Sequence, residues 1–410
     1  MNIFNSVNIY ITVLILAITY IPSTLNVVLL GALFALLFYK NRKKFVLNMP
    51  GEDLCVLLFI IGIIIGFFGI FTKSTSLYEL IKHIYFFLFP FLYWHIGNYL
   101  VKTRLVTKKS FLNTLVFNAV LISSIDIIMA VFKICTNNAY SINQFRELIG
   151  TGNILSLIGI YILFVYKNDL YFTRKQNVIV ISICLLSSII HFSRMTILYA
   201  IIFLLFSNFN PFSKKGKRCI LIGVCLILLL TIIFPNIMGS YISKIFSSLK
   251  EINFNKSDWN ETTIVLNWRG YEVYCALDQF KGFSFFKKIF GNGFGTMIDA
   301  KGYAYLVSQK DYLSFLHNGY FTQLLIWGVF GWVIFALWMY RFLKISISIS
   351  SKNDRNFSMI LILVIIVANF FVMGPFFSQT IASLFLYISV LFSLNKKRHI
   401  RRKDSCVTTN

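Results

Sequence analysis

Charged residues are scarce in this sequence, and acidic residues are the scarcest of them. Only 13% of the 410 residues are charged, and Asp and Glu together number 15. A soluble domain carries roughly 25% charged residues, so this chain cannot build the usual solvated surface. Because 57% of its residues are hydrophobic, the composition indicates an integral membrane protein.

Motifs of several enzyme classes are also missing. The sequence has no HExxH, no GxSxG, no P-loop and no pair of acids at metal-ligand spacing. The seven cysteines show no CxxC spacing, and we expect neither a metal nor a cofactor. Cys135 and Cys275 fall in segments predicted to face outward, and the sequence leaves their pairing open. The first apolar segment lacks a basic start and a cleavage site, so we interpret it as a mature helix.

The net charge of +24 does not indicate a nucleic-acid partner, because the basic residues form no patch on a soluble face. They stand in short clusters between long apolar runs, which is the pattern of a protein surrounded by membrane lipids. About twelve of these runs are long enough to cross a bilayer. They lie near 3–21, 24–39, 53–71, 84–101, 111–132, 149–166, 177–191, 194–209, 219–235, 318–340, 357–373 and 377–394. The first two runs leave open a helical hairpin or one long helix broken at Pro22.

Lys and Arg gather in every second connection between the runs and in the tail after residue 395. Short connections of this kind face the cytoplasm. We therefore predict a multi-pass protein of a bacterial inner membrane with both termini in the cytoplasm. Its parts would be membrane helices over 1–234, a large periplasmic loop over 235–316, membrane helices over 317–394 and a basic cytoplasmic tail over 395–410. The loop is too polar to cross a membrane, and we expect it to fold as short helices over the outer mouth of the bundle.

Asp126 is the one acid well inside an apolar run. An ionisable group at that depth is costly unless it faces protein or water, which favours a functional role. A hydrogen bond to a neighbouring helix explains it equally well, and both interpretations stay open.

Three arginines, one histidine and a glycine-rich turn all fall on the predicted outer face. Each of them is weak evidence alone, because an interfacial Arg commonly extends to lipid headgroups and a single histidine is commonly a spectator. They are Arg146, Arg194, Arg269, His317 and the turn Gly291-Asn292-Gly293-Phe294-Gly295. Together they suit an anionic substrate that arrives in the membrane, since Arg grips phosphate with two hydrogen bonds and His can take a proton from a sugar hydroxyl.

The same residues carry a resemblance to the superfamily of O-antigen ligases and O-antigen polymerases. Ser193-Arg194 before an apolar run resembles its first arginine motif, and Arg269 followed by the 291–295 turn resembles the second. The stretch from Leu316-His317-Asn318 to Gly331 resembles its "HNxxLxxLxxxGxxG" element. Arg146 with Gly150 and Asn153 resembles "RxxGxxxNPN", although the proline is absent.

The resemblance implies an all-α, GT-C-like membrane glycosyltransferase that needs no metal. Its donor would be an oligosaccharide on undecaprenyl pyrophosphate, and a second lipid-linked repeat would be the acceptor. Arg194 and Arg269 would bind the donor pyrophosphate, and His317 would be the base. Arg146, Asn318, Gly291, Gly293 and Gly295 would contact substrate, and a chain-length regulator would be a further partner.

Three functions remain open at this point. A polysaccharide polymerase is the leading interpretation, partly because the outer segment is rich in aromatic residues that could stack on sugars. A ligase that moves finished O-antigen onto lipid A-core is the alternative within the superfamily. A glycolipid flippase or transporter is the alternative from another class, disfavoured because transporters commonly show internal symmetry and several ionisable residues at the midplane.

Overall fold

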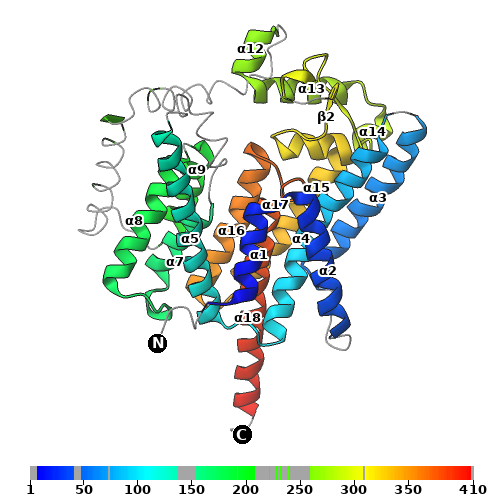
Figure 1. Ribbon diagram of the computed structural model, residues 1–410. Coiled ribbons are helices and arrows are strands. Elements are labelled where there is room, and N and C mark those ends of the chain that lie inside the picture. The colour runs from blue at the N-terminus through cyan, green and yellow to red at the C-terminus, as the bar shows by residue number, and fades with distance from the viewer. Residues whose placement is uncertain are drawn as a thin grey trace. The chain divides into compact units, whose positions relative to one another are not determined.

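The computed structural model in Figure 1 describes residues 7–40, 48–72, 74–136, 154–191, 193–207, 259–307 and 310–407, together with positions 221, 228, 231–232 and 239. These ranges are mostly α-helical. The helices are α1 (Ile9–Tyr20), α2 (Ser23–Lys40), α3 (Glu52–Phe71), α4 (Leu77–Lys102), α5 (Lys108–Cys135), α7 (Ile154–Val165), α8 (Arg174–Ile190), α9 (Arg194–Phe206), α12 (Glu261–Leu266), α13 (Trp268–Lys281), α14 (Phe285–Phe290), α15 (Gly319–Ile347), α16 (Lys352–Phe371), α17 (Gln379–Ala382) and α18 (Leu384–Val407). The short 3-10 turns are η2 (Lys167–Asp169) and η3 (Ala304–Leu306), and the strands are β1 (Ile298–Asp299) and β2 (Tyr312–Leu313).

Within the described residues, each predicted span except 219–235 overlaps a helix, and 377–394 overlaps two, α17 and α18. Most of 219–235 lies outside the described residues. Apolar runs become helices because the bilayer offers no water to backbone N–H and C=O groups, which must bond within the segment. Five described helices are long and apolar enough to cross a membrane: α3, α4, residues 108–132 of α5, α15 and α16. A helical membrane protein is therefore confirmed, while the count of about twelve spans stays a prediction. The first two runs form separate helices, with α1 ending at Tyr20 and α2 beginning at Ser23.

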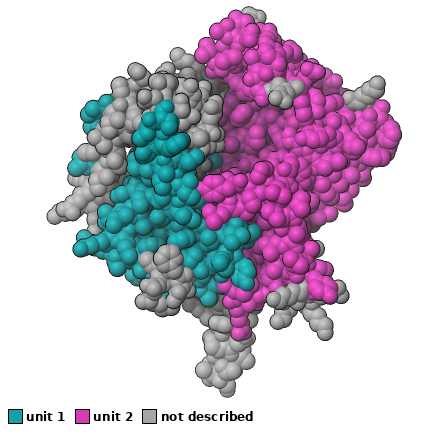
Figure 2. Space-filling model, viewed as in Figure 1, with its two compact units in different colours: residues 1–15, 106–250 teal, residues 16–105, 251–410 magenta. Residues whose placement is uncertain are grey.

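The chain divides into two compact units, coloured separately in Figure 2. The first comprises residues 1–15 and 106–250, and its core is the packing of α5, α7 and α8. Gly159 of α7 lies against Ala119 of α5, so two helix backbones approach closely at that point. Small residues at such crossings are typical of membrane helices.

The second unit comprises residues 16–105 and 251–410, and α4, α15 and α18 run through its core. α18 packs on α4, where the Ser389 hydroxyl donates to the Trp94 carbonyl oxygen. A cluster of aromatic rings fills the centre of this unit. It comprises Phe87, Phe294, Trp327, Trp338, Phe376 and Phe385.

The described part of the predicted outer loop, 259–307 and 310–316, folds as short helices with a two-stranded ribbon. α12, α13 and α14 follow one another, and β1 pairs with β2 in antiparallel register, Ile298 opposite Leu313. Short helices agree with the expectation from sequence, and the ribbon was not expected. The ribbon returns the chain from α14 to the start of α15, and so it places the segment that carries His317.

Candidate active site

The start of α13 is fixed by its own capping residue. The Asn267 side-chain oxygen accepts a hydrogen bond from the Gly270 backbone N–H at 3.2 Å, which satisfies one of the donors left free at a helix start. Trp268, Arg269 and Glu272 then stand within the first turns of α13. Residues three or four apart are neighbours on one helix face, so Glu272 is next to both Trp268 and Arg269.

The start of α15 is fixed in the same manner. The Asn318 side-chain oxygen accepts from the Tyr320 and Phe321 backbone N–H groups, at 3.0 and 3.3 Å. The Thr322 hydroxyl accepts from the Leu316 backbone N–H at 3.1 Å, which ties the incoming chain to the first turn. His317 is thus held directly before a capped helix. Asn318, predicted to contact substrate, acts here as the helix cap, and the predicted contact stays a prediction.

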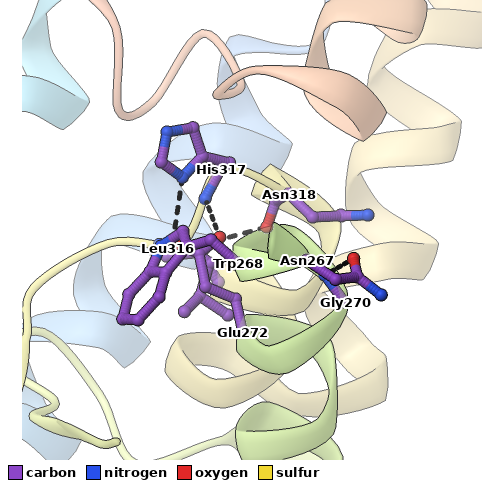
Figure 3. A network of polar contacts seen from close by, with 8 residues as sticks. Asn267, Trp268, Gly270, Glu272, Leu316, His317 and Asn318 are labelled. Carbon is purple, nitrogen blue, oxygen red and sulfur yellow. Dashed lines mark hydrogen bonds and ion pairs between the residues drawn. The ribbon is translucent and has the colours of Figure 1, made fainter. Parts of the chain in front are cut away.

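Glu272 and His317 form the centre of the site, drawn in Figure 3. Glu272 Oε1 lies 2.9 Å from His317 Nδ1, and Glu272 Oε2 lies 2.8 Å from the His317 backbone nitrogen. The Trp268 indole nitrogen donates to Oε1 at 2.6 Å. The carboxylate therefore meets three donors. Its side chain is 3% exposed, whereas that of His317 is 43% exposed, so the acid is buried beneath a histidine that is open on its other side.

This arrangement determines which nitrogen of His317 can act as a base. An ionised carboxylate only accepts hydrogen bonds, so Nδ1 carries the proton that it donates to Glu272. Nε2 then presents its lone pair, and no described residue occupies it with a hydrogen bond. A carboxylate behind the ring also stabilises the imidazolium that forms when Nε2 takes a proton. The pair has the geometry of a general base held by an acid.

Glu272 was not singled out from the sequence, where it is one of several acids in the outer segment. It lies 45 positions from His317 along the chain, so no local pattern joins them. The available signal was its position in α13, one turn after Trp268 and three residues after Arg269.

The predicted arginines are placed as follows. Arg269 is partly buried on α13, one turn from Glu272, in the same unit as His317. Arg194 is the first residue of α9, partly buried and preceded by the capping position Ser193, in the other unit. Arg146 lies outside the described residues. The structure therefore brings Arg269 close to the histidine pair, and the roles of all three arginines stay predictions.

The glycine-rich turn is packed against other segments through its backbone. The Gly293 N–H donates to the Ile326 carbonyl oxygen at 2.9 Å, and the Gly295 N–H donates to His83 Nδ1 at 3.0 Å. Gly291, Gly293 and Gly295 all have positive φ, and a Cβ on Gly293 would overlap the Gly66 backbone. Close backbone approach explains these glycines. The predicted phosphate contact stays a prediction, and these two N–H groups are already used within the protein.

Asp126, whose role the sequence left open, has a polar environment inside the first unit. Its Oδ2 accepts from the Ser187 hydroxyl at 2.9 Å and contacts His191 Nε2 at 3.0 Å. His191 caps the end of α8, three residues before Arg194. Asp126 therefore ties α5 to the turn between α8 and α9. Cys135 and Cys275, also left open, are both free thiols.

Part of this region is similar to one family of known proteins. Residues 178–336 match the family of O-antigen ligases. The resemblance to the superfamily of O-antigen ligases and polymerases is thus confirmed, and the matched range contains Arg194, Arg269, Glu272, the glycine-rich turn and His317. Asp126 and Arg146 precede the matched range. No curated protein matches the chain.

Proposed function

We propose that the protein is a polysaccharide polymerase of the bacterial inner membrane. It transfers a glycan from undecaprenyl pyrophosphate to the hydroxyl of another lipid-linked repeat, on the periplasmic side and without a metal. The observation that carries the proposal is the Glu272–His317 pair, one helical turn from Arg269, within the range that matches the O-antigen ligase family. An acid-supported histidine beside an arginine suits an attacking hydroxyl and an anionic leaving group.

The residues divide the chemistry between them. His317 Nε2 takes the proton of the acceptor hydroxyl as its oxygen attacks the anomeric carbon of the donor sugar. The bond between that carbon and the phosphate oxygen breaks, and undecaprenyl pyrophosphate leaves with the electron pair. Arg194 and Arg269 neutralise the charge that develops on the pyrophosphate, and Glu272 keeps the imidazolium in place.

The test uses the purified full-length chain in liposomes that contain an undecaprenyl-pyrophosphate-linked repeat. We expect chain elongation, detected as a ladder of lipid-linked products. His317→Ala should lower the rate by about 10²–10⁴-fold, the usual contribution of a general base. Because His317 is half-exposed before α15, the variant should insert and purify normally. Elongation by His317→Ala at the wild-type rate would refute the proposed base, and glycolipid movement without elongation would indicate a flippase.

A ligase is the second candidate, favoured by the description of the matching family. Its chemistry at His317 would be the same, and only the acceptor would differ. The two candidates therefore separate in the products that accumulate in a cell, and not in the site residues.

A further inference from the structure

The first turns of α4 contact two segments of the candidate site at once. These contacts come from Glu79 and His83, which are one helical turn apart and face residues 310–315. Residues 310–316 contain the strand β2 and lead into His317. Both α4 residues and the segment that they contact belong to the second unit.

His83 uses both ring nitrogens, one for each segment. Nδ1 accepts from the Gly295 backbone N–H at 3.0 Å, and Nε2 lies 3.3 Å from the Ser314 carbonyl oxygen. A carbonyl oxygen only accepts, so Nε2 carries the proton and the ring is neutral. His83 is 1% exposed, and its ring stacks on that of Phe315 with centroids 4.7 Å apart.

Glu79 holds the beginning of the same segment. Its carboxylate pairs with the Lys310 ammonium and accepts from the Tyr312 hydroxyl at 3.3 Å. The side chain is wholly buried and also lies 3.7 Å from the Lys82 ammonium. Although burial disfavours the charged form of Lys310, the hydrogen bond from its ammonium to Glu79 raises the pKa of Lys310 above its usual value. The ion pair is therefore formed at neutral pH.

We infer that His83 and Glu79 are positioning residues for His317, acting through the backbone of residues 310–316. This inference rests on the proposed function, in which His317 is the base. Glu272 holds His317 itself, and α4 holds the segment that precedes His317 in the chain. A base must lie within a few tenths of an ångström of its place, because a displacement of about 1 Å can cost on the order of 10² in rate.

Simple packing does not account for His83. A buried apolar residue would fill the same volume against Phe315 without the cost of placing a polar ring there. The histidine instead supplies one acceptor and one donor, each used by a backbone group that has no partner from regular secondary structure. The link from Nε2 to Ser314 is the one that reaches the segment before His317.

The experiment separates the two nitrogens of His83 in the liposome elongation assay. His83→Gln keeps a donor at the reach of Nε2, and His83→Asn keeps an acceptor at the position of Nδ1. We expect His83→Ala and His83→Asn to lower kcat about tenfold with KM unchanged, and His83→Gln to retain most of kcat. If the alanine variant fails to fold, the kcat of His83→Gln, compared with that of His83→Asn, tests the proposal.

The matched control is His95→Gln, which replaces another buried histidine of the same helix. His95 pairs with Glu52 and not with the segment before His317, so kcat should stay at the wild-type value. In a His317→Ala background, His83→Ala should cause no further loss, because a positioning residue acts only through the group it positions. Equal losses in both backgrounds, or wild-type kcat in His83→Ala, would overturn the inference.

A second measurement does not depend on activity. Hydrogen exchange of the amides of residues 310–318 in detergent should be faster in His83→Ala than in the wild type and in His95→Gln. Unchanged exchange would show that α4 does not hold this segment, which overturns the inference. If the wild type performs no transfer, the proposed function fails, and the exchange measurement still decides whether His83 fixes the segment.

Discussion

Glu272 binds His317 twice, with one carboxylate oxygen on the ring and the other on the main chain. The two distances, 2.9 Å to Nδ1 and 2.8 Å to the backbone nitrogen, place ring and backbone against one rigid group. Trp268 donates to the same carboxylate and keeps it from rotating. One buried acid thus sets both the tautomer and the position of the His317 ring.

Replacing Glu272 with Gln should therefore remove catalysis while preserving shape. Gln has one carbonyl oxygen and one amide nitrogen, so it can accept from only one of the two His317 donors. Where the amide nitrogen faces Nδ1, it donates to that atom and favours the tautomer with the proton on Nε2. We expect kcat for elongation to fall about 10²–10⁴-fold. The measurement is the initial rate in liposomes at saturating donor.

Asp278→Asn is the matched control for that substitution. Asp278 stands in the same helix, is half-exposed and pairs with Lys301. An exposed ion pair contributes about 0–1 kcal/mol, so neither the rate nor the folding of the variant should change measurably. Wild-type kcat in Glu272→Gln would show that the acid does not support the base.

Arg194→Lys and Arg269→Lys should each raise KM for the lipid-linked donor. Lysine keeps the charge but loses the planar group that holds two phosphate oxygens, and one charged hydrogen bond is worth about 1.5–3 kcal/mol. The expected increase is about tenfold or more in each variant. Arg174→Lys, at an exposed position in the first turn of α8, is the control and should behave as wild type. A wild-type KM for the donor in both test variants would show that these arginines contact lipid headgroups and do not bind the donor.

Gly293→Ala should prevent folding, whereas Gly302→Ala should be tolerated. The two glycines have nearly the same φ, +80° and +82°, so both substitutions carry the left-handed strain of about 1–2 kcal/mol. Only at Gly293 would the added Cβ overlap another backbone, that of Gly66, while Gly302 has open space. We expect low yield of Gly293→Ala and a Tm near wild type for Gly302→Ala, measured in detergent. Equal yields would contradict the close approach.

The helices could be predicted from sequence because a single local property, an uninterrupted apolar run, determines them. The turn at Pro22 was left open, since a proline ends or kinks a helix with nearly the same local signal. The ribbon of Ile298 with Leu313 was missed because two-residue strands carry no periodicity.

The site could be predicted only as single residues. His317 and Arg269 stand in recognisable motifs, but Glu272 becomes significant only when folding brings α13 to the start of α15. The glycine-rich turn shows the same limit. Its glycines suggested a bound phosphate, and the folded chain gives them a second reason, the backbones of Gly66 and Ile326, which are far away in sequence.

Orientation in the membrane is tested by labelling single cysteines in intact spheroplasts with an impermeant maleimide. Thr262→Cys, exposed in α12, should react, whereas Asn168→Cys, exposed in η2, should not. The distribution of Lys and Arg predicts that Thr262 faces outward and Asn168 faces the cytoplasm. Native Cys275 serves as the unreactive control in the outer segment, since burial raises the pKa of its thiol to about 11. The opposite labelling pattern would reverse the orientation and place the site in the cytoplasm.

Polymerase and ligase differ in the acceptor, which the site residues do not reveal. A polymerase accepts a second polyprenyl-linked repeat, whereas a ligase accepts lipid A-core. The outer segment favours a specific saccharide acceptor through its aromatic residues. Three of them, Trp259, Tyr271 and Tyr274, lie with ring centroids within 5.2–6.2 Å of one another, beside Tyr303. Trp259 and Tyr274 are partly exposed and can stack on sugars, whereas Tyr271 is buried beside them.

Deleting the gene that encodes this chain in its host, and separating the surface glycolipids on a gel, decides between the two. Loss of a polymerase should leave core capped with one repeat unit, because transfer to lipid A-core continues with unpolymerised donor. Loss of a ligase should leave bare core, because polymer continues to form but cannot leave the carrier. Complementation with wild type should restore the ladder, and complementation with His317→Ala should not. Bare core beside a ladder of carrier-bound polymer would contradict the polymerase and assign the chain as a ligase, with the Glu272–His317 pair serving a lipid A-core acceptor.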